Sequence, residues 1–473
     1  MNATRKKVEF GDFQTPSALA ESVVKKLVEL GVAPDVVVEP TCGIGAFVTA
    51  AASKFPKAAV HGYEINNAYL EDLTHNLSAA SRPRVHLRQA DFFATDWGSE
   101  VKGMGGRLLI LGNLPWVTSA ALGALNSKNL PTKSNFQGHS GFDSISGKAN
   151  FDISEWMMLC LIRELRGKPY DIAMLLKTAT ARKVIGFVEK NDIGVGYAGI
   201  FNIDAKKEFN ASVDASLLLL RFTGEEPRGT LEYEVFSSLN SHDRVRVGHR
   251  HGISIRDLAV FDRHAHMVGQ SPQKWRSGVK HDAAAIMEFT QTTGGLLNGL
   301  GEVVELEPAY LYPLMKGSDI GSNRGWRSKF VLVTQQKTGE DTAHIQRNAP
   351  NTWHYLERHA DALDSRGSTI YAKGHRFSVF GVGDYAFRPW KVAICGLYKK
   401  LNFRLVGPIN GKPVMFDDTV CFVSFETESA AQEALDKITS EQTTALMSSM
   451  IFWDEKRPIK SSILNTLDWT QAA

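Results

Sequence analysis

The sequence predicts an α/β fold in which a doubly wound, mostly parallel sheet is followed by a second domain of mixed α+β structure. Short apolar runs that suit buried strands alternate with helical patterns along the first half of the chain. Several of these runs end directly in acidic, amide or glycine residues, as strands do at the ligand-binding edge of an open sheet. The length of 473 residues exceeds the usual size of one domain. A change in composition at 224–229 indicates the border, so we expect domains at 1–228 and 229–473.

Hydrophobic spacing predicts the individual elements of the first domain. A helix is expected over 17–30, where leucine and valine recur at helical intervals. Buried strands are expected at 36–38, 58–63, 84–88, 108–111, 170–176 and 216–221, and further helices from Ala46 onward and over 153–166. The first four strands lead to Glu39, Glu64, Asp91 and Asn113, so these side chains should meet at one edge of the sheet.

Composition and cysteine usage exclude several classes of protein. A hydrophobic content of 43% and a net charge of +3 are ordinary for a globular chain. The four cysteines are scattered, without the paired spacing of a metal site or a disulfide framework, so we expect reduced thiols, no bound metal and a cytoplasmic location. No apolar run is long enough to cross a bilayer, so no membrane partner is expected.

A glycine turn after the first strand suggests a cofactor site. Gly43 and Gly45 let the backbone approach a ligand closely between a strand and a helix N-terminus. Glu39 precedes this turn, and its charge would disfavour a phosphate but suit a cationic cofactor that carries a sulfonium and an α-ammonium group.

Two later strand ends complete this pattern. Glu64 could accept hydrogen bonds from ribose hydroxyls. Asp91 and Phe92 offer a carboxylate for an adenine amine and a ring for its face. Each residue also has a purely structural interpretation: Glu64 beside a helix cap, Asp91 in a turn and Phe92 in the core.

The turn Gly112–Trp116 suits the capture of a planar group with an exocyclic amine. The Asn113 side-chain oxygen and the Leu114 carbonyl can accept hydrogen bonds from that amine, and the Trp116 ring can stack on the plane. An ordinary strand-end turn is the alternative interpretation.

The motifs together resemble the S-adenosylmethionine-dependent DNA adenine-N6 methyltransferases of type II restriction-modification systems. The resemblance rests on Phe10–Pro16, Glu39–Phe47, Glu64, Asp91–Phe93, Asn113–Trp116 and Glu208–Val213, in this order. It covers roughly 8–222 with specific motifs and extends more loosely to the C-terminal half, where it implies a target-recognition domain.

By this resemblance the first domain has a Rossmann-like methyltransferase sheet and each motif residue has a role. The cofactor S-adenosylmethionine would be bound by Thr15, Glu39, Gly43, Gly45, Glu64, Asp91 and Phe92. Asn113, Leu114, Pro115 and Trp116 would hold the flipped adenine, with Phe209 packing against the base. Leu114 stands where this subgroup usually has proline, but the role of the position belongs to a backbone carbonyl. The Asn-Leu-Pro-aromatic turn also occurs in ribosomal-RNA adenine dimethyltransferases.

Basic residues indicate where DNA would be bound. The polar segment 118–150 contains Lys128, Lys133 and Lys148, and we expect a loop that contacts DNA, with a disordered insertion as the alternative. The stretch 242–281 is rich in arginine, lysine and histidine, and Arg276 and Lys280 are the expected phosphate contacts. Such a charged run is otherwise a solvated face.

The sequence therefore predicts a site-specific methyltransferase that acts on the N6 amine of a flipped adenine in double-stranded DNA. Restriction-modification or a related defence is the expected context, with a separately encoded endonuclease or defence protein as a candidate partner. The alternatives are an RNA adenine methyltransferase, a protein-glutamine methyltransferase and a DNA-binding module without activity.

Overall fold

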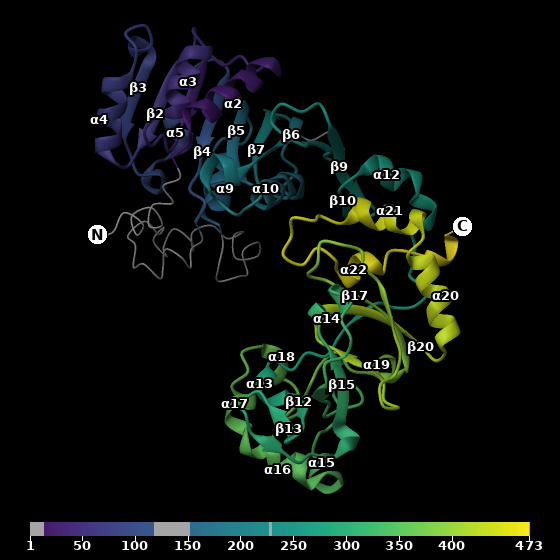
Figure 1. The fold of residues 1–473 in the computed structure, drawn as a ribbon. Coiled ribbons are helices and arrows are strands. Elements are labelled where there is room, and N and C mark those ends of the chain that lie inside the picture. The colour runs from purple at the N-terminus through teal and green to yellow at the C-terminus, as the bar shows by residue number, and fades with distance from the viewer. Residues whose placement is uncertain (1–13, 118–151, 227–228, 473) are drawn as a thin grey trace. The chain divides into compact units, whose positions relative to one another are not determined.

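The computed structural model describes residues 14–117, 152–226 and 229–472, and the chain forms two compact units, Met1–Leu258 and Ala259–Ala473 (Figure 1). The border lies later than the expected 228/229. Three further strands after that point continue the sheet of the first unit, so the change in composition at 224–229 marks a connection inside this unit.

The first unit is built on a ten-stranded sheet with the order β10-β9-β8-β6-β7-β5-β4-β1-β2-β3. Its strands are β1 (Val36–Glu39), β2 (Ala59–Glu64), β3 (Val85–Gln89), β4 (Leu108–Asn113), β5 (Pro169–Lys177), β6 (Val195–Ile203), β7 (Ala215–Thr223), β8 (Tyr233–Phe236), β9 (Arg244–Arg250) and β10 (Ile253–Ile255). Strands β1 to β5 pair in parallel, whereas β7 runs antiparallel to both β5 and β6. The expected doubly wound α/β fold is confirmed.

Helices cover this sheet. They are α2 (Ser17–Glu29), α3 (Ala46–Lys54), α4 (Asn67–Asn76), α5 (Trp97–Lys102), α9 (Ile153–Glu164), α10 (Thr178–Lys190) and α11 (Ala205–Phe209). Apolar residues of α2, α3 and α4 form one core cluster with alternate residues of the central strands, such as Leu109 and Leu111. The intervening strand residues Ile110 and Ile172 are also fully buried, as expected for a sheet covered on both faces.

The start and end of α2 follow from its sequence. Pro16 stands at the N-cap, where its missing N–H costs nothing, and Leu19, Val23 and Leu27 are buried on one face. Gly31 ends the helix with φ +74°, a left-handed conformation that glycine adopts without strain.

The second unit contains two smaller sheets. The four-stranded sheet has the order β11-β20-β17-β18 and the six-stranded sheet the order β14-β13-β12-β16-β15-β19. The strands are β11 (Arg276–Ser277), β12 (Glu288–Thr292), β13 (Gly295–Asn298), β14 (Val303–Val304), β15 (Leu311–Met315), β16 (Lys329–Leu332), β17 (Trp390–Cys395), β18 (Arg404–Val406), β19 (Met415–Phe416) and β20 (Val420–Phe425).

Helices of the second unit are mostly short. They are α13 (Ala284–Met287), α14 (Gly317–Gly321), α15 (His344–Asn348), α16 (Pro350–Arg358), α17 (Ala360–Asp364), α18 (Thr369–Ala372), α19 (Asp384–Phe387), α20 (Glu428–Ile438), α21 (Glu441–Met450) and α22 (Ser461–Leu464), while α12 (Leu258–Arg263) spans the border. The expected mixed α+β character is confirmed.

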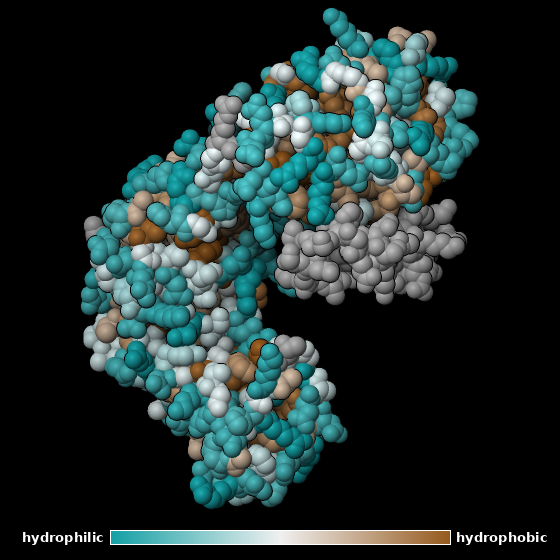
Figure 2. Space-filling view, turned by 180° about the vertical axis from the view of Figure 1, so that it is seen from behind, coloured by the Kyte–Doolittle hydropathy of each residue, from teal (hydrophilic) through white to brown (hydrophobic). Residues whose placement is uncertain are grey.

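The visible surface is largely hydrophilic, with hydrophobic residues in scattered areas (Figure 2). Among the described helices, none is long and apolar enough to span a bilayer.

Candidate functional site

The strand order reverses between β1 and β4, and the predicted site residues lie there. Both strands run in parallel, so Glu39 and Asn113 stand at the same carboxyl edge of the sheet. In open α/β sheets this edge at the reversal point is where ligands bind. The Glu39 side chain lies against the backbone of Gly112, since a Cβ built on Gly112 would be 3.4 Å from Glu39 Cγ.

The turn between β1 and α3 has the conformation that its glycines suggest. Gly43 and Gly45 have φ of +51° and +83°. The Gly43 N–H donates to Glu64 Oε2 at 2.9 Å, and the Asn66 N–H donates to Glu64 Oε1 at 2.9 Å. Glu64 therefore ties this turn to the end of β2, and its carboxylate oxygens retain lone pairs for further donors.

Gln14 is a site residue that the sequence motifs did not single out. Its Oε1 accepts a hydrogen bond from the Ile44 N–H at 3.2 Å and lies 2.6 Å from the position that a Cβ on Gly43 would occupy. The glycine therefore makes room for Gln14. Its place directly before Thr15 in the N-terminal motif was the available signal.

Glu39 is suited to a cationic group. The residue is 3% exposed, and Oε2 has no hydrogen-bond partner among the described residues. Burial raises the pKa of Glu39 well above its ordinary value, the Val48 backbone N–H opposes this rise, and the charge of Glu64 adds to it. A cation beside Glu39 would stabilise the ionised form, so the residues present fit the sulfonium and ammonium groups of the implied cofactor.

Asp91 and Phe92 have structural roles in this structure. Asp91 caps a short 3-10 helix by accepting from the Phe93 N–H at 2.9 Å, and its side chain is exposed. Phe92 is 7% exposed and packs on Trp97 with ring centroids 5.1 Å apart. Their adenine-binding roles stay predictions.

At the predicted catalytic turn, Gly112–Trp116, two residues of the turn meet residues from distant parts of the chain: Asn113 contacts Thr15, and Trp116 contacts Phe209. Asn113 Nδ2 donates to Thr15 Oγ1 at 3.2 Å, which directs the amide. Trp116 is 6% exposed and meets Phe209 edge to face, with centroids 4.9 Å apart. Leu114 is buried at 1% exposure and Pro115 is partly exposed.

Phe209 reaches this turn because α11 connects β6 and β7. Asp204 caps α11 by accepting from the Lys207 N–H, and Asn210 ends it with φ 52°. Strand β7 pairs with β5, so the short helix stands at the carboxyl edge of β5, beside the end of β4.

The expected DNA contacts have mixed outcomes. Lys128, Lys133 and Lys148 lie outside the described residues. Arg276 is exposed and its guanidinium lies 4.9 Å from the centre of the Tyr385 ring. Lys280 pairs with Asp282 at 3.4 Å.

The arginines of β9 lie in local ion pairs. Arg246 and Arg250 contact Glu232 at 3.2 and 3.0 Å, and Arg244 pairs with Glu234 on the neighbouring strand β8. This part of the basic stretch is a solvated face with its charges largely neutralised.

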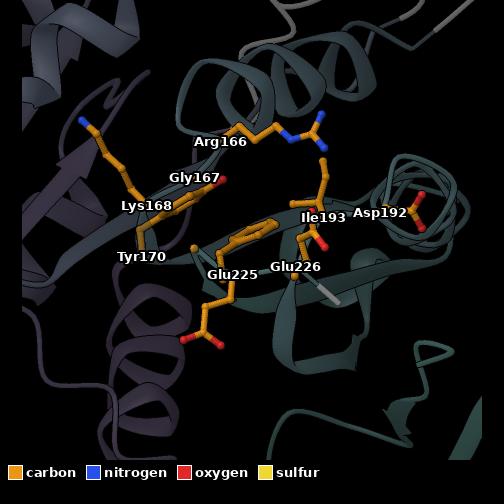
Figure 3. Close-up of a pocket in the computed structure, with 11 residues that line it drawn as sticks. Arg166, Gly167, Lys168, Tyr170, Asp192, Ile193, Glu225 and Glu226 are labelled. Carbon is orange, nitrogen blue, oxygen red and sulfur yellow. The ribbon is translucent and has the colours of Figure 1, made fainter. Parts of the chain in front are cut away.

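A cavity of about 200 Å³ lies elsewhere, lined by Arg166, Tyr170, Asp192 and Glu226 among others (Figure 3). Tyr170 is near the amino end of β5, whereas the predicted catalytic turn is beside the carboxyl end of this strand. At about 3.3 Å per residue, the two ends of β5 are about 26 Å apart. None of the predicted site residues lines this cavity. In the described parts of the chain, no group of three or more His, Cys, Asp or Glu is placed to hold a metal ion.

Comparison with known proteins shows a relative that matches almost the full length of the chain. The chain is 45% identical over 470 residues to the Type II methyltransferase M.NspV from Nostoc sp., covering 99% of this chain and 98% of the relative. Among solved structures, the Type IIL restriction-modification enzyme MmeI in complex with DNA aligns with a TM-score of 0.54 and 13% identity, over 98% of this chain and 69% of MmeI. No family model matches the sequence.

Proposed function

Because the chain belongs to the type II methyltransferases, we propose that it methylates the N6 amine of a specific adenine in double-stranded DNA as part of a restriction-modification system. S-adenosylmethionine is the cofactor of this family. When bound, it supplies an electrophilic methyl group on a positively charged sulfur.

The observation that carries the choice of adenine is the Asn113–Trp116 turn beside Glu39. A side-chain amide oxygen and a backbone carbonyl are two acceptors for the two hydrogens of an exocyclic amine. Trp116 and Phe209 add two rings that meet at 4.9 Å. A planar base with an amine matches this combination of acceptors and rings, and the neighbouring Glu39 suits the cationic cofactor.

The residues of the turn would activate a poor nucleophile. The lone pair of an adenine amine is conjugated into the ring, and acceptance of both hydrogens by Asn113 and Leu114 draws the nitrogen toward tetrahedral geometry. Stacking on an aromatic side chain is worth about 1–3 kcal/mol for each base. That contribution offsets part of the few kcal/mol needed to extrude a base from the duplex. Catalysis would thus consist of positioning and electrostatics.

We infer that the cofactor is held by Thr15, Glu39, Gly43, Gly45 and Glu64 at the edge of β1 and β2. Thr15 also bonds Asn113 at 3.2 Å, so it links the cofactor side of the site to the catalytic turn. In the second unit, exposed Arg276 and partly exposed Lys280 are our proposed phosphate contacts.

The test is methyl transfer from labelled cofactor to duplex DNA, with digestion to nucleosides to identify the modified base. We expect N6-methyladenine in duplex DNA and a loss of about 100-fold or more in Asn113→Ala, the range seen when one transition-state hydrogen-bonding group is removed. Cofactor binding by this variant should survive.

The control is Asn76→Ala, which changes an exposed asparagine at the end of α4. This variant should retain full activity. Methylated cytosine, preference for structured RNA or wild-type turnover by Asn113→Ala would contradict the proposal.

A further inference from the structure

A partly buried ion pair stands at the carboxyl end of β5, next to the catalytic turn. Lys177 Nζ lies 2.6 Å from Asp152 Oδ2, with side-chain exposures of 23% and 9%. The other oxygen of Asp152 accepts from the backbone N–H and the hydroxyl of Ser154, which is fully buried. The carboxylate is thus fixed by three donors at the start of α9.

Two hydrogen bonds connect the neighbours of this ion pair to Trp116 and Val117. The Ile153 N–H donates to the Val117 carbonyl at 2.9 Å, so the residue after Asp152 holds the residue after Trp116. Trp116 Nε1 donates to the Leu175 carbonyl at 3.4 Å, two residues before Lys177 on the same strand. The tryptophan ring and the backbone beyond it are therefore held from the same strand end by separate routes.

A gain in the folding stability of the protein is a weak explanation for a partly buried ion pair of this kind. Replacing a buried ion pair with apolar residues is often neutral or stabilising, whereas removing one partner leaves a buried charge uncompensated. A charged pair does fix the distance and direction between two elements, and here the elements are the end of β5 and the start of α9.

The same region contains a matched comparison. A second ion pair, between Lys183 Nζ and Glu155 Oε2 at 2.6 Å, joins α10 to α9, but the Lys183 side chain is 58% exposed. Glu155 lies three residues further along α9 than Asp152, and its Oε2 accepts a hydrogen bond from Lys183. Exposed pairs of this kind contribute about 0–1 kcal/mol.

We propose that the Asp152–Lys177 pair is a positioning device for methyl transfer, which holds the Val117 side of the catalytic turn so that Trp116 keeps the geometry needed to stack on the target base. This inference rests on the proposed adenine methylation. Lys177 acts through Asp152 and Ile153 and has no contact with the reacting atoms.

The experiment compares Lys177→Met and Asp152→Asn with Lys183→Met in the full chain. Asparagine preserves the helix cap of Asp152 but removes its charge. Single-turnover methylation of a duplex that contains the target adenine gives the rate. The fluorescence of a second duplex, with 2-aminopurine in place of that adenine, reports the environment of the base, and hydrogen exchange at the Ile153 amide reports the turn directly.

We expect both pair variants to lower kcat by about tenfold or more, since displacement of a reacting group by 1 Å can cost about 100-fold. Their KM for cofactor should stay near the wild-type value, the Ile153 amide should exchange faster, and Lys177→Arg should restore most of kcat. Lys183→Met should match the wild type in all readouts.

Three results would overturn the positioning role: wild-type kcat in both pair variants, slow turnover with unchanged exchange at Ile153, or weaker DNA binding in Lys177→Met alone, which would assign Lys177 to a phosphate contact. Failure of the wild-type protein to methylate adenine would instead refute the proposed function, and the exchange measurement would still report whether the pair holds the turn.

Discussion

Replacement of Glu39 by glutamine tests the cation site with little change in shape. Glu39 is 3% exposed, and Oε2 has no hydrogen-bond partner in the described part of the chain. Its pKa is raised well above the ordinary value because the carboxyl is buried, the Val48 N–H opposes this, and Glu64 adds repulsion. Burial therefore disfavours the ionised form of Glu39 in the free protein, and an amide of the same size should fit.

The expected loss of cofactor affinity follows from this burial. The carboxyl group is already removed from water before the ligand arrives, so the attraction between its ionised form and a cation is weakly screened. A hydrogen bond to a charged group is worth about 1.5–3 kcal/mol, and its loss corresponds to about a 10- to 150-fold higher Kd.

Titration calorimetry of S-adenosylmethionine binding across pH gives a second signature. A cation favours ionised Glu39, so wild-type binding releases a proton and the affinity should rise with pH until the raised pKa is passed. Glu39→Gln should lack this rise. Equal Kd and equal pH dependence in the two proteins would refute the reasoning.

Stability gives an independent check with the opposite sign. The folded-state pKa of Glu39 is raised, so its contribution to stability is present at low pH and is lost as the pH rises through that pKa. Melting curves should therefore favour Glu39→Gln over the wild type increasingly as the pH rises.

Three further substitutions address other parts of the molecule. Phe209→Ala removes the ring whose centroid lies 4.9 Å from that of Trp116. We expect kcat/KM to fall by at least about fivefold, the lower bound for the loss of one stacking partner, while the circular dichroism spectrum stays unchanged. An unaltered kcat/KM would count against the base-stacking role. Gly45→Ala forces a φ of +83° on alanine and drives its Cβ into the Leu73 side chain. Calorimetry should show that the free energy of unfolding falls by at least about 1–2 kcal/mol. An unchanged melting temperature would contradict this expectation. Arg276→Ala should weaken DNA binding across sequences and lower the salt slope by about 1 in fluorescence anisotropy titrations, whereas an unchanged slope would remove it from the phosphate contacts.

The sheet was predictable because each strand carries its own signal. An apolar run such as 108–111 can be recognised as a buried strand without knowing which strands lie beside it. The observed strand β4 begins at the same residue and continues two residues further, to Asn113. The polar residues at strand ends could be placed at one edge because parallel strands share that edge. Strand β6 was not predicted, since Gly196 and Gly199 interrupt its apolar pattern.

The sequence alone could not predict which charged side chains pair with each other across the sheet. Arg246 and Arg250 suggested a phosphate surface, but the pairing of β8 with β9 brings Glu232, the residue before β8, into contact with both arginines. Register depends on which strands become neighbours, and the charge count of a segment contains no such information. The ion pair of Asp152 and Lys177 was missed for the same reason.

The hydrogen bond between the Ile153 N–H and the Val117 carbonyl joins the residue after Trp116 to the first residue of α9. Both groups belong to the main chain, so side-chain substitutions around the turn leave the donor and the acceptor in place. Proline removes the N–H but is tolerated in the first turn of a helix. Ile153→Pro would therefore separate the end of the turn from α9 while α9 itself stays formed.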